Sequence, residues 1–141
     1  VRQGDEEQYT SIASLEDAVV VTQSGSVQEA LYREQVQRCR ELKLVSSMTD
    51  GYLIVAEGKA DVCICSTGSA QLYAEANGGL GISNFTFQVD ESMQGTRVGM
   101  PVGADSLTEF VNGCIDELQA AGQLDAWYQA ATEYAKSLGL E

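Results

Sequence analysis

Short apolar segments alternate with segments that carry helix signals along the first half of this chain of 141 residues. The clearest apolar segment is Val19-Val20-Val21-Thr22, whose β-branched residues favour a buried strand. Leu44-Val45 and residues 61–65 are two further predicted strands, and a helix over 70–76 follows the last of them. This strand–helix order predicts an α/β fold with a parallel sheet and right-handed crossovers, built as three layers with helices on both faces of the sheet.

Serine residues mark the starts of the two helices between these strands. Ser26 is followed three residues later by Glu29, a capping-box pattern, and loosely spaced apolar residues predict a helix from there through Lys43. Ser47 opens the second helix in the same way, and Gly58 ends it.

The last third of the chain is predicted to be mostly helical. Two extended segments are expected before it, over 85–89 and 96–102. Ser106 and Glu109 form another capping box, and Gly122 ends the helix that they open. The next helix carries an apolar stripe at helical spacing, made of Leu124, Trp127, Tyr128, Ala131, Tyr134, Ala135 and Leu138. We expect this stripe to form part of a packed core rather than a binding platform.

Charge and the lack of histidine exclude several classes of function. The chain has 8 basic and 21 acidic side chains and a formal net charge of −13, so we expect no binding to nucleic acid, and anionic membranes are disfavoured. With no histidine, Ser-His and Cys-His catalysis and the commonest metal ligand are missing. No apolar run approaches the ~20 residues that span a bilayer. We expect no catalytic residues, no metal site and no cofactor.

Four cysteines, Cys39, Cys63, Cys65 and Cys114, could form two disulfides in three connectivities. Cys63 and Cys65 alternate in a strand pattern that places both side chains on one face, but no second pair of ligands completes a zinc site. We expect reduced, buried thiols that serve packing.

Two predicted strands end in turns that open helices, which is where α/β sheets bind ligands. The first turn is Gln23-Ser24-Gly25-Ser26-Val27, and the second is Cys65-Ser66-Thr67-Gly68. Hydroxyls and the free amides of a helix N-terminus suit a carboxylate or a phosphate. The alternative at both turns is that the hydroxyl only caps its own helix. A Walker-type phosphate loop is disfavoured because no Gly-Lys-Ser/Thr ending is present.

A series of short motifs spans nearly the whole chain. They are Val1-Arg2-Gln3-Gly4-Asp5, Ser14-Leu15-Glu16-Asp17, Val19-Val20-Val21-Thr22-Gln23-Ser24-Gly25-Ser26, Glu57-Gly58-Lys59-Ala60-Asp61-Val62 and Val98-Gly99-Met100-Pro101-Val102, followed by Leu107, Val111-Asn112, Leu118 and Gly122. In this order and spacing they resemble the polar-amino-acid family of bacterial extracellular solute-binding proteins.

The resemblance implies a type II periplasmic-binding-protein fold, in which two α/β lobes close on a ligand and deliver it to an ABC permease. Residues 1–95 would form the second, ligand-binding lobe, and residues 96–141 the returning crossover strand and C-terminal helices that pack on the first lobe. We expect a fragment that lacks the N-terminal lobe segment, with exposed apolar surface that a second copy could cover in a homodimer. The resemblance also implies an extracytoplasmic location.

The resemblance assigns roles to individual residues as well. The family's Gly-Thr-Thr turn, which holds the ligand's α-carboxylate, falls on Gly25-Ser26-Val27, where Val27 keeps the backbone donor but lacks a hydroxyl. The family's aspartate that pairs with the α-ammonium falls on Ser66, which accepts a hydrogen bond without bringing negative charge. Gln23 occupies a position that can face the ligand's side chain. The implied ligand is therefore an amino acid or a related small carboxylate.

Two other functions stay open at this point. The same fold serves as the extracytoplasmic sensor domain of signalling proteins, and a few relatives are enzymes. We do not expect an enzyme, because the acidic residues are scattered along predicted helix surfaces and turns instead of being paired for acid–base work.

Overall fold

The computed structural model describes residues 1–91 and 94–137. It divides into two compact units, Val1–Gln94 and Gly95–Glu141. The first unit contains a sheet with its covering helices, and the second contains two long helices.

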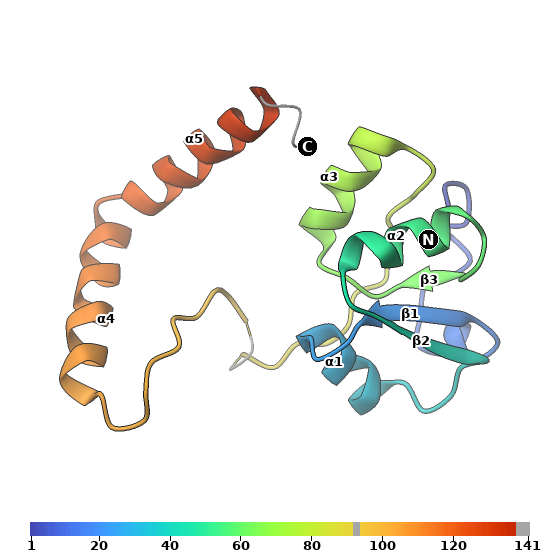
Figure 1. Cartoon of the computed structure of the whole chain (residues 1–141), viewed down its shortest axis with the longest axis horizontal. Helices are drawn as coiled ribbons and strands as arrows, with labels where there is room; N and C mark the ends of the chain where they lie inside the picture. Colours follow the sequence, from blue (N-terminus) through green and yellow to red (C-terminus); the bar gives the residue numbers. More distant parts are fainter. Residues whose placement is uncertain (92–93, 138–141) are drawn as a thin grey trace. The chain divides into compact units, whose positions relative to one another are not determined.

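The sheet of the first unit has three parallel strands in the order β2-β1-β3 (Figure 1). β1 spans Val19–Gln23, β2 spans Glu41–Val45 and β3 spans Val62–Cys63. β1 pairs with β2 along its whole length and with β3 over two residues. The parallel α/β sheet predicted from the alternation of strands and helices is confirmed.

Helices follow each strand, and a short 3-10 helix, η1, precedes the first. Their bounds are Ala13–Leu15 for η1, Val27–Gln35 for α1, Met48–Ala56 for α2 and Thr67–Asn77 for α3. Figure 1 shows α1 and α2 on different sides of the strands.

Side chains of β1 alternate between two apolar clusters, one on each face of the sheet. Val20 packs in a cluster of Tyr9, Leu15, Ala18, Val36, Val62 and Ile64. Val19 and Val21 pack instead with Val55 of α2 and with Ala60. Val20, Val21 and Val55 have no exposed surface. Because both faces of β1 are buried, the three-layer architecture follows directly from its four consecutive apolar and β-branched residues.

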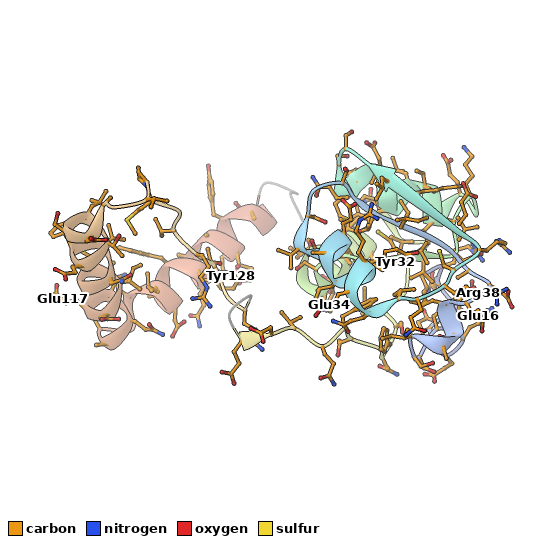
Figure 2. All side chains as sticks on the ribbon, turned by 90° about the horizontal axis from the view of Figure 1, so that it is seen from below. Glu16, Tyr32, Glu34, Arg38, Glu117 and Tyr128 are labelled. Atoms are coloured by element: carbon orange, nitrogen blue, oxygen red, sulfur yellow. The ribbon has the colours of Figure 1, made fainter. Side chains whose placement is uncertain are left out.

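Ion pairs and hydrogen bonds hold the opposite, amino-terminal edge of the sheet. The Asp61 carboxylate accepts from the Val19 amide at 2.8 Å and from the Arg40 guanidinium at 2.9 Å, so it joins the starts of all three strands. Glu16 and Arg38 form a second, more exposed ion pair of 2.9 Å beside this edge (Figure 2). The exposed pair contributes little to stability because water screens it.

The helix predicted through Lys43 is wrong in its second half. α1 ends at Gln35, because Val36 has extended backbone angles (φ −95°, ψ 108°). Glu41–Val45 then pairs with β1, so the strand begins three residues before the predicted Leu44. Pairing with a buried strand outweighs a loose helical periodicity, since tertiary context overrides weak local propensity.

The third strand and its helix also have different bounds from those predicted. β3 covers only Val62–Cys63 of the predicted 61–65, and α3 begins at Thr67, three residues before the predicted start. The Ile64 amide still donates to Val21 O at 2.9 Å, but the Thr22 hydroxyl donates to the Ile64 carbonyl at 3.0 Å.

Residues 85–89 and 96–102, all of which the structure describes, form no strand. The Gln35 side chain takes the place of a strand partner at the first of these segments: its amide donates to Gln88 O at 2.6 Å and accepts from Gln88 N at 3.3 Å. Phe87 packs against the first apolar cluster. The segment is thus held by side chains, which an apolar pattern alone cannot distinguish from a strand.

The second unit contains α4, Asp105–Ala120, and α5, Gln123–Ser137. The capping box predicted at Ser106 is wrong, because the helix begins at Asp105 with Ala104 as N-cap and no side-chain cap. Ser106 therefore lies inside the first turn.

The apolar stripe predicted to form a core is largely exposed. Trp127, Tyr128 and Tyr134 have 54%, 77% and 66% of their surface exposed, and Phe110 of α4 has 69%. Leu138, the last residue of the predicted stripe, lies outside the described residues. These side chains have no apolar partner within this unit that buries them.

All four cysteines are free thiols, and each is half-buried rather than fully buried. The expectation of unpaired thiols holds, while full burial does not. Within residues 1–91 and 94–137, no helix combines the length and the hydropathy needed to cross a bilayer.

Candidate functional site

The turn after β1 is organised by the Ser26 side chain. Its hydroxyl donates to Gln23 O at 2.7 Å and accepts from the Glu29 amide at 3.2 Å. Ser26 is thus the N-cap of α1, as the capping-box pattern predicts. The hydroxyl closes the turn while the backbone amides that follow it remain at the start of the helix, where no intrahelical acceptor is available to them.

Glu29 also reaches back to this turn. Its carboxylate accepts from the Gly25 amide at 2.7 Å and pairs with the Arg33 guanidinium at 2.6 and 2.7 Å. These two interactions, with the Gly25 bond first, lower the pKa of Glu29. The contact with Gly25 was not predicted from the sequence, although the Ser26–Glu29 spacing was the signal for it. It shows that this turn accommodates a carboxylate, and Arg33 balances the charge that Glu29 brings.

Gly25 has a left-handed backbone conformation, with φ +73°, and a Cβ at this position would meet no atom within 4 Å. Glycine is therefore needed here for the backbone angle and not for a close contact. The open space leaves the backbone of the turn approachable.

The turn after β3 differs, because its serine does not cap the helix. Ser66 is the N-cap residue of α3 by position, yet its side chain makes no capping hydrogen bond and is exposed. Ser69, one turn into the helix, instead donates to Ser66 O at 3.1 Å. The alternative that Ser66 serves only as a cap is therefore wrong.

Parallel pairing brings the two turns to the same edge of the sheet. Val21 lies opposite Cys63 in the register of β1 and β3, so Gln23 and residue 65 end neighbouring strands on the same side. The Thr22–Ile64 hydrogen bond fixes the last pair of residues before the turns. Gln23 itself donates to Ser46 O at 3.1 Å, at the end of β2.

The chemistry of this edge is that of a binding site for a small anion or zwitterion. It offers hydroxyls, an amide side chain and the amino ends of α1 and α3, whose partial positive charge favours a carboxylate. Among the described residues, no group of three or more His, Cys, Asp or Glu side chains is arranged to hold a metal ion.

Comparisons with known proteins identify the fold. No family model matches the chain, and no curated protein is significantly similar to it in sequence. Solved structures do match. An amino acid ABC transporter substrate-binding protein from Streptococcus pneumoniae, bound to L-arginine, has a TM-score of 0.82 and 25% identity over 94% of this chain. An ancestral arginine-binding protein bound to arginine has a TM-score of 0.75 and 21% identity over 92% of this chain.

These matches cover 55% and 57% of the solved chains, so this chain spans little more than half their length. An ancestral cyclohexadienyl dehydratase also matches, with a TM-score of 0.54 and 25% identity over 92% of this chain and 54% of that one. The fold therefore occurs in binding proteins and in an enzyme. The chain has the type II periplasmic-binding-protein fold of the amino acid ABC transporter substrate-binding proteins, over about half of their length.

Proposed function

We propose that this chain is the ligand-binding lobe of an ABC-transporter solute-binding protein for an amino acid or a related small carboxylate. The observation that carries the proposal is the pair of turns after β1 and β3, side by side at the carboxyl edge of the sheet. Similar structures were solved with arginine or glutamine bound. The proposal includes an extracytoplasmic location and delivery of the ligand to an ABC permease.

In this proposal the two turns divide the ligand between them. The backbone amides of Ser26 and Val27, at the start of α1, take the α-carboxylate, with Ser24 and Gly25 forming the approachable rim of the turn. Ser66 takes the α-ammonium as a hydrogen-bond acceptor, and Gln23 faces the ligand's side chain. Glu29 already holds the Gly25 amide, so the ligand uses the amides that follow it.

Charge at Ser66 is the weak point of the site. Hydrogen bonds to charged groups contribute about 1.5–3 kcal/mol when their geometry is good, and an anionic acceptor meets an ammonium better than a hydroxyl does. A helix N-terminus adds about 0.3–1 kcal/mol, whereas micromolar affinity needs about 8 kcal/mol. We therefore expect this chain by itself to bind amino acids in the millimolar range or more weakly.

Ser66→Asp tests the proposal by supplying the missing charge. We expect it to tighten the binding of L-arginine or L-glutamine roughly 10- to 100-fold, the equivalent of one charged hydrogen bond. Ser69→Asp is the matched control, since it adds the same charge one helical turn further along α3. Binding is measured by isothermal titration calorimetry and checked by the ligand-induced rise in melting temperature.

Equal affinities in the wild type, Ser66→Asp and Ser69→Asp would contradict the assignment of Ser66. A flat response of every variant to a panel of amino acids and small carboxylates would contradict the proposed ligand class.

Binding is proposed rather than turnover. The side chains at the two turns are hydroxyls and one amide, and the one carboxylate that reaches the first turn is paired with Arg33. General acid–base catalysis would need a titratable group free to exchange a proton with the substrate.

The division of labour between the two units is also part of the proposal. Residues 1–95 form the ligand-binding lobe, and residues 96–141 form the crossover and the helices that pack on a first lobe. The exposed aromatic side chains of α5 support this assignment, because a contiguous apolar surface marks an interaction site. A second copy of the chain in a homodimer is the other candidate for covering it.

A further inference from the structure

Three sulfur atoms gather at the contact between α2 and the third strand, away from the turns described above. Cys63 and Cys65 are two residues apart in extended chain, so both side chains point to the face that α2 covers. The Cys63 Sγ lies 3.5 Å from the Met48 Sδ in the first turn of α2. The Cys65 Sγ lies 3.5 Å from the carbonyl oxygen of Cys63.

A glycine makes room for two of these sulfurs. Gly51 is buried in the middle of α2, and a Cβ there would lie 3.2 Å from Cys63 Sγ and 3.8 Å from Met48 Sδ. Glycine inside a helix costs about 1 kcal/mol relative to alanine. At this position the loss is offset by space in which the two sulfurs meet.

The two thiols interact with each other, and the interaction polarises them. The hydrogen bond from Cys63 lowers the pKa of Cys65, while the same bond and burial raise the pKa of Cys63. The Tyr52 hydroxyl further favours the thiolate of Cys65. Met48, Cys63 and Cys65 are each half-buried, so the cluster is neither sealed in the core nor fully exposed.

The ligand chemistry favours a soft cation. Thiolate and thioether sulfur select Cu(I) among the biological metals, whereas Zn(II) usually takes four ligands from Cys, His or carboxylate. Metal–sulfur bonds of about 2.3 Å place two sulfurs of a three-coordinate site about 4 Å apart. The 3.5 Å between Cys63 and Met48 is within about half an ångström of that separation.

We propose that Met48, Cys63 and Cys65 form a three-sulfur site for a monovalent soft cation, Cu(I) in particular. The site does not depend on the proposed amino-acid function. Binding replaces the two thiol protons, which pass to water, and changes no oxidation state. The thioether of Met48 supplies a third lone pair without giving up a proton.

The test is an anaerobic titration of the full chain with Cu(I) against a chromogenic chelator of known affinity. We expect one equivalent to bind, with a thiolate-to-metal absorption band in the near ultraviolet. Cys63→Ser and Cys65→Ser should each abolish this band. Cys39→Ser and Cys114→Ser are the matched controls, because they remove thiols outside the cluster and should leave both band and stoichiometry unchanged.

The thioether has its own pair of variants. Met48→Leu should weaken binding by at least the roughly 10-fold that changing even an outer-shell partner of a metal produces. Met100→Leu is the control, since Met100 lies in the other unit with its sulfur 3.7 Å from Thr108 Oγ1. Equal affinity of Met48→Leu and the wild type would contradict the three-sulfur site.

A readout on the unaltered protein guards against variants that fail to fold. Bound Cu(I) should protect Cys63 and Cys65, and not Cys39 or Cys114, from alkylation mapped by mass spectrometry. Protection of the control cysteines instead, absence of binding, or a Cys63–Cys65 disulfide in the protein as purified would each overturn the proposal.

Discussion

Removing the Thr22 hydroxyl tests the link between the ends of β1 and β3. Thr22 is fully buried, and its Oγ1 donates to Ile64 O at 3.0 Å. Thr22→Val keeps the shape of the side chain but removes the donor, so the buried carbonyl of Ile64 loses this hydrogen bond. Leaving a buried polar group unsatisfied costs about 1–3 kcal/mol, and we expect the free energy of unfolding to fall by that amount.

The assay is urea unfolding followed by far-ultraviolet circular dichroism, with thermal melts as a second measurement. Tryptophan fluorescence would report on the wrong part of the chain, because the single tryptophan, Trp127, lies in α5. In a domain of this size each 1 kcal/mol lowers the melting temperature by about 4–8 °C. We therefore expect a drop of at least about 4 °C for Thr22→Val.

Ser14→Ala is the matched control for Thr22→Val. It removes a hydroxyl that donates to Ser11 O at 2.7 Å in an exposed place, where water can replace the bond. We expect a change within about 0.5 kcal/mol, as for most surface substitutions. If Thr22→Val proved as stable as Ser14→Ala or the wild type, the proposed role of the hydroxyl at the strand ends would be refuted.

Three further predictions concern the first unit. Ser26→Ala should lower the free energy of unfolding by about 0.5–2 kcal/mol in urea titrations, since the N-cap of α1 is lost; no change would mean that Glu29 alone holds the turn. Val55→Ala removes two buried methyl groups at about 0.8 kcal/mol each and leaves a cavity, so calorimetry should show a loss above about 1.6 kcal/mol; a smaller loss would argue against a tightly packed α2. Burial raises the pKa of Tyr52 from 10.0 to about 12. Since the folded state then keeps a proton that the unfolded state releases, this contribution is fully present below pH 10 and is lost as the pH rises towards 12. Stability of the wild type and Tyr52→Phe should differ in slope only in that range, and parallel curves there would contradict the shift.

Local signals were sufficient to predict most of the helix starts in the first unit. Ser26 and Ser47 cap α1 and α2 as their spacing to Glu29 and Asp50 indicates. These signals act within one turn of backbone, so a single sequence contains them completely. The same pattern failed at Ser106, where the helix starts one residue earlier without a side-chain cap.

Features that depend on distant partners could not be predicted in the same way. The length of β2 is set by its pairing with β1, and the segment around Gln88 is held by the side chain of Gln35. Neither partner can be identified from an apolar pattern. At the candidate site, both turns were predicted from the sequence, whereas the carboxylate of Glu29 at Gly25 and the contact between Met48 and Cys63 emerged only from the fold.

A nuclear magnetic resonance titration of the chain with L-arginine tests the central claim most directly. Backbone amide shifts detect the weak, millimolar binding expected of this chain and locate it residue by residue. The account predicts saturable shifts that concentrate at Gly25, Ser26 and Val27 and at Ser66, while the amides of α4 and α5 stay unchanged. Saturable shifts elsewhere with none at the two turns, or no shifts at tens of millimolar L-arginine and L-glutamine, would contradict it.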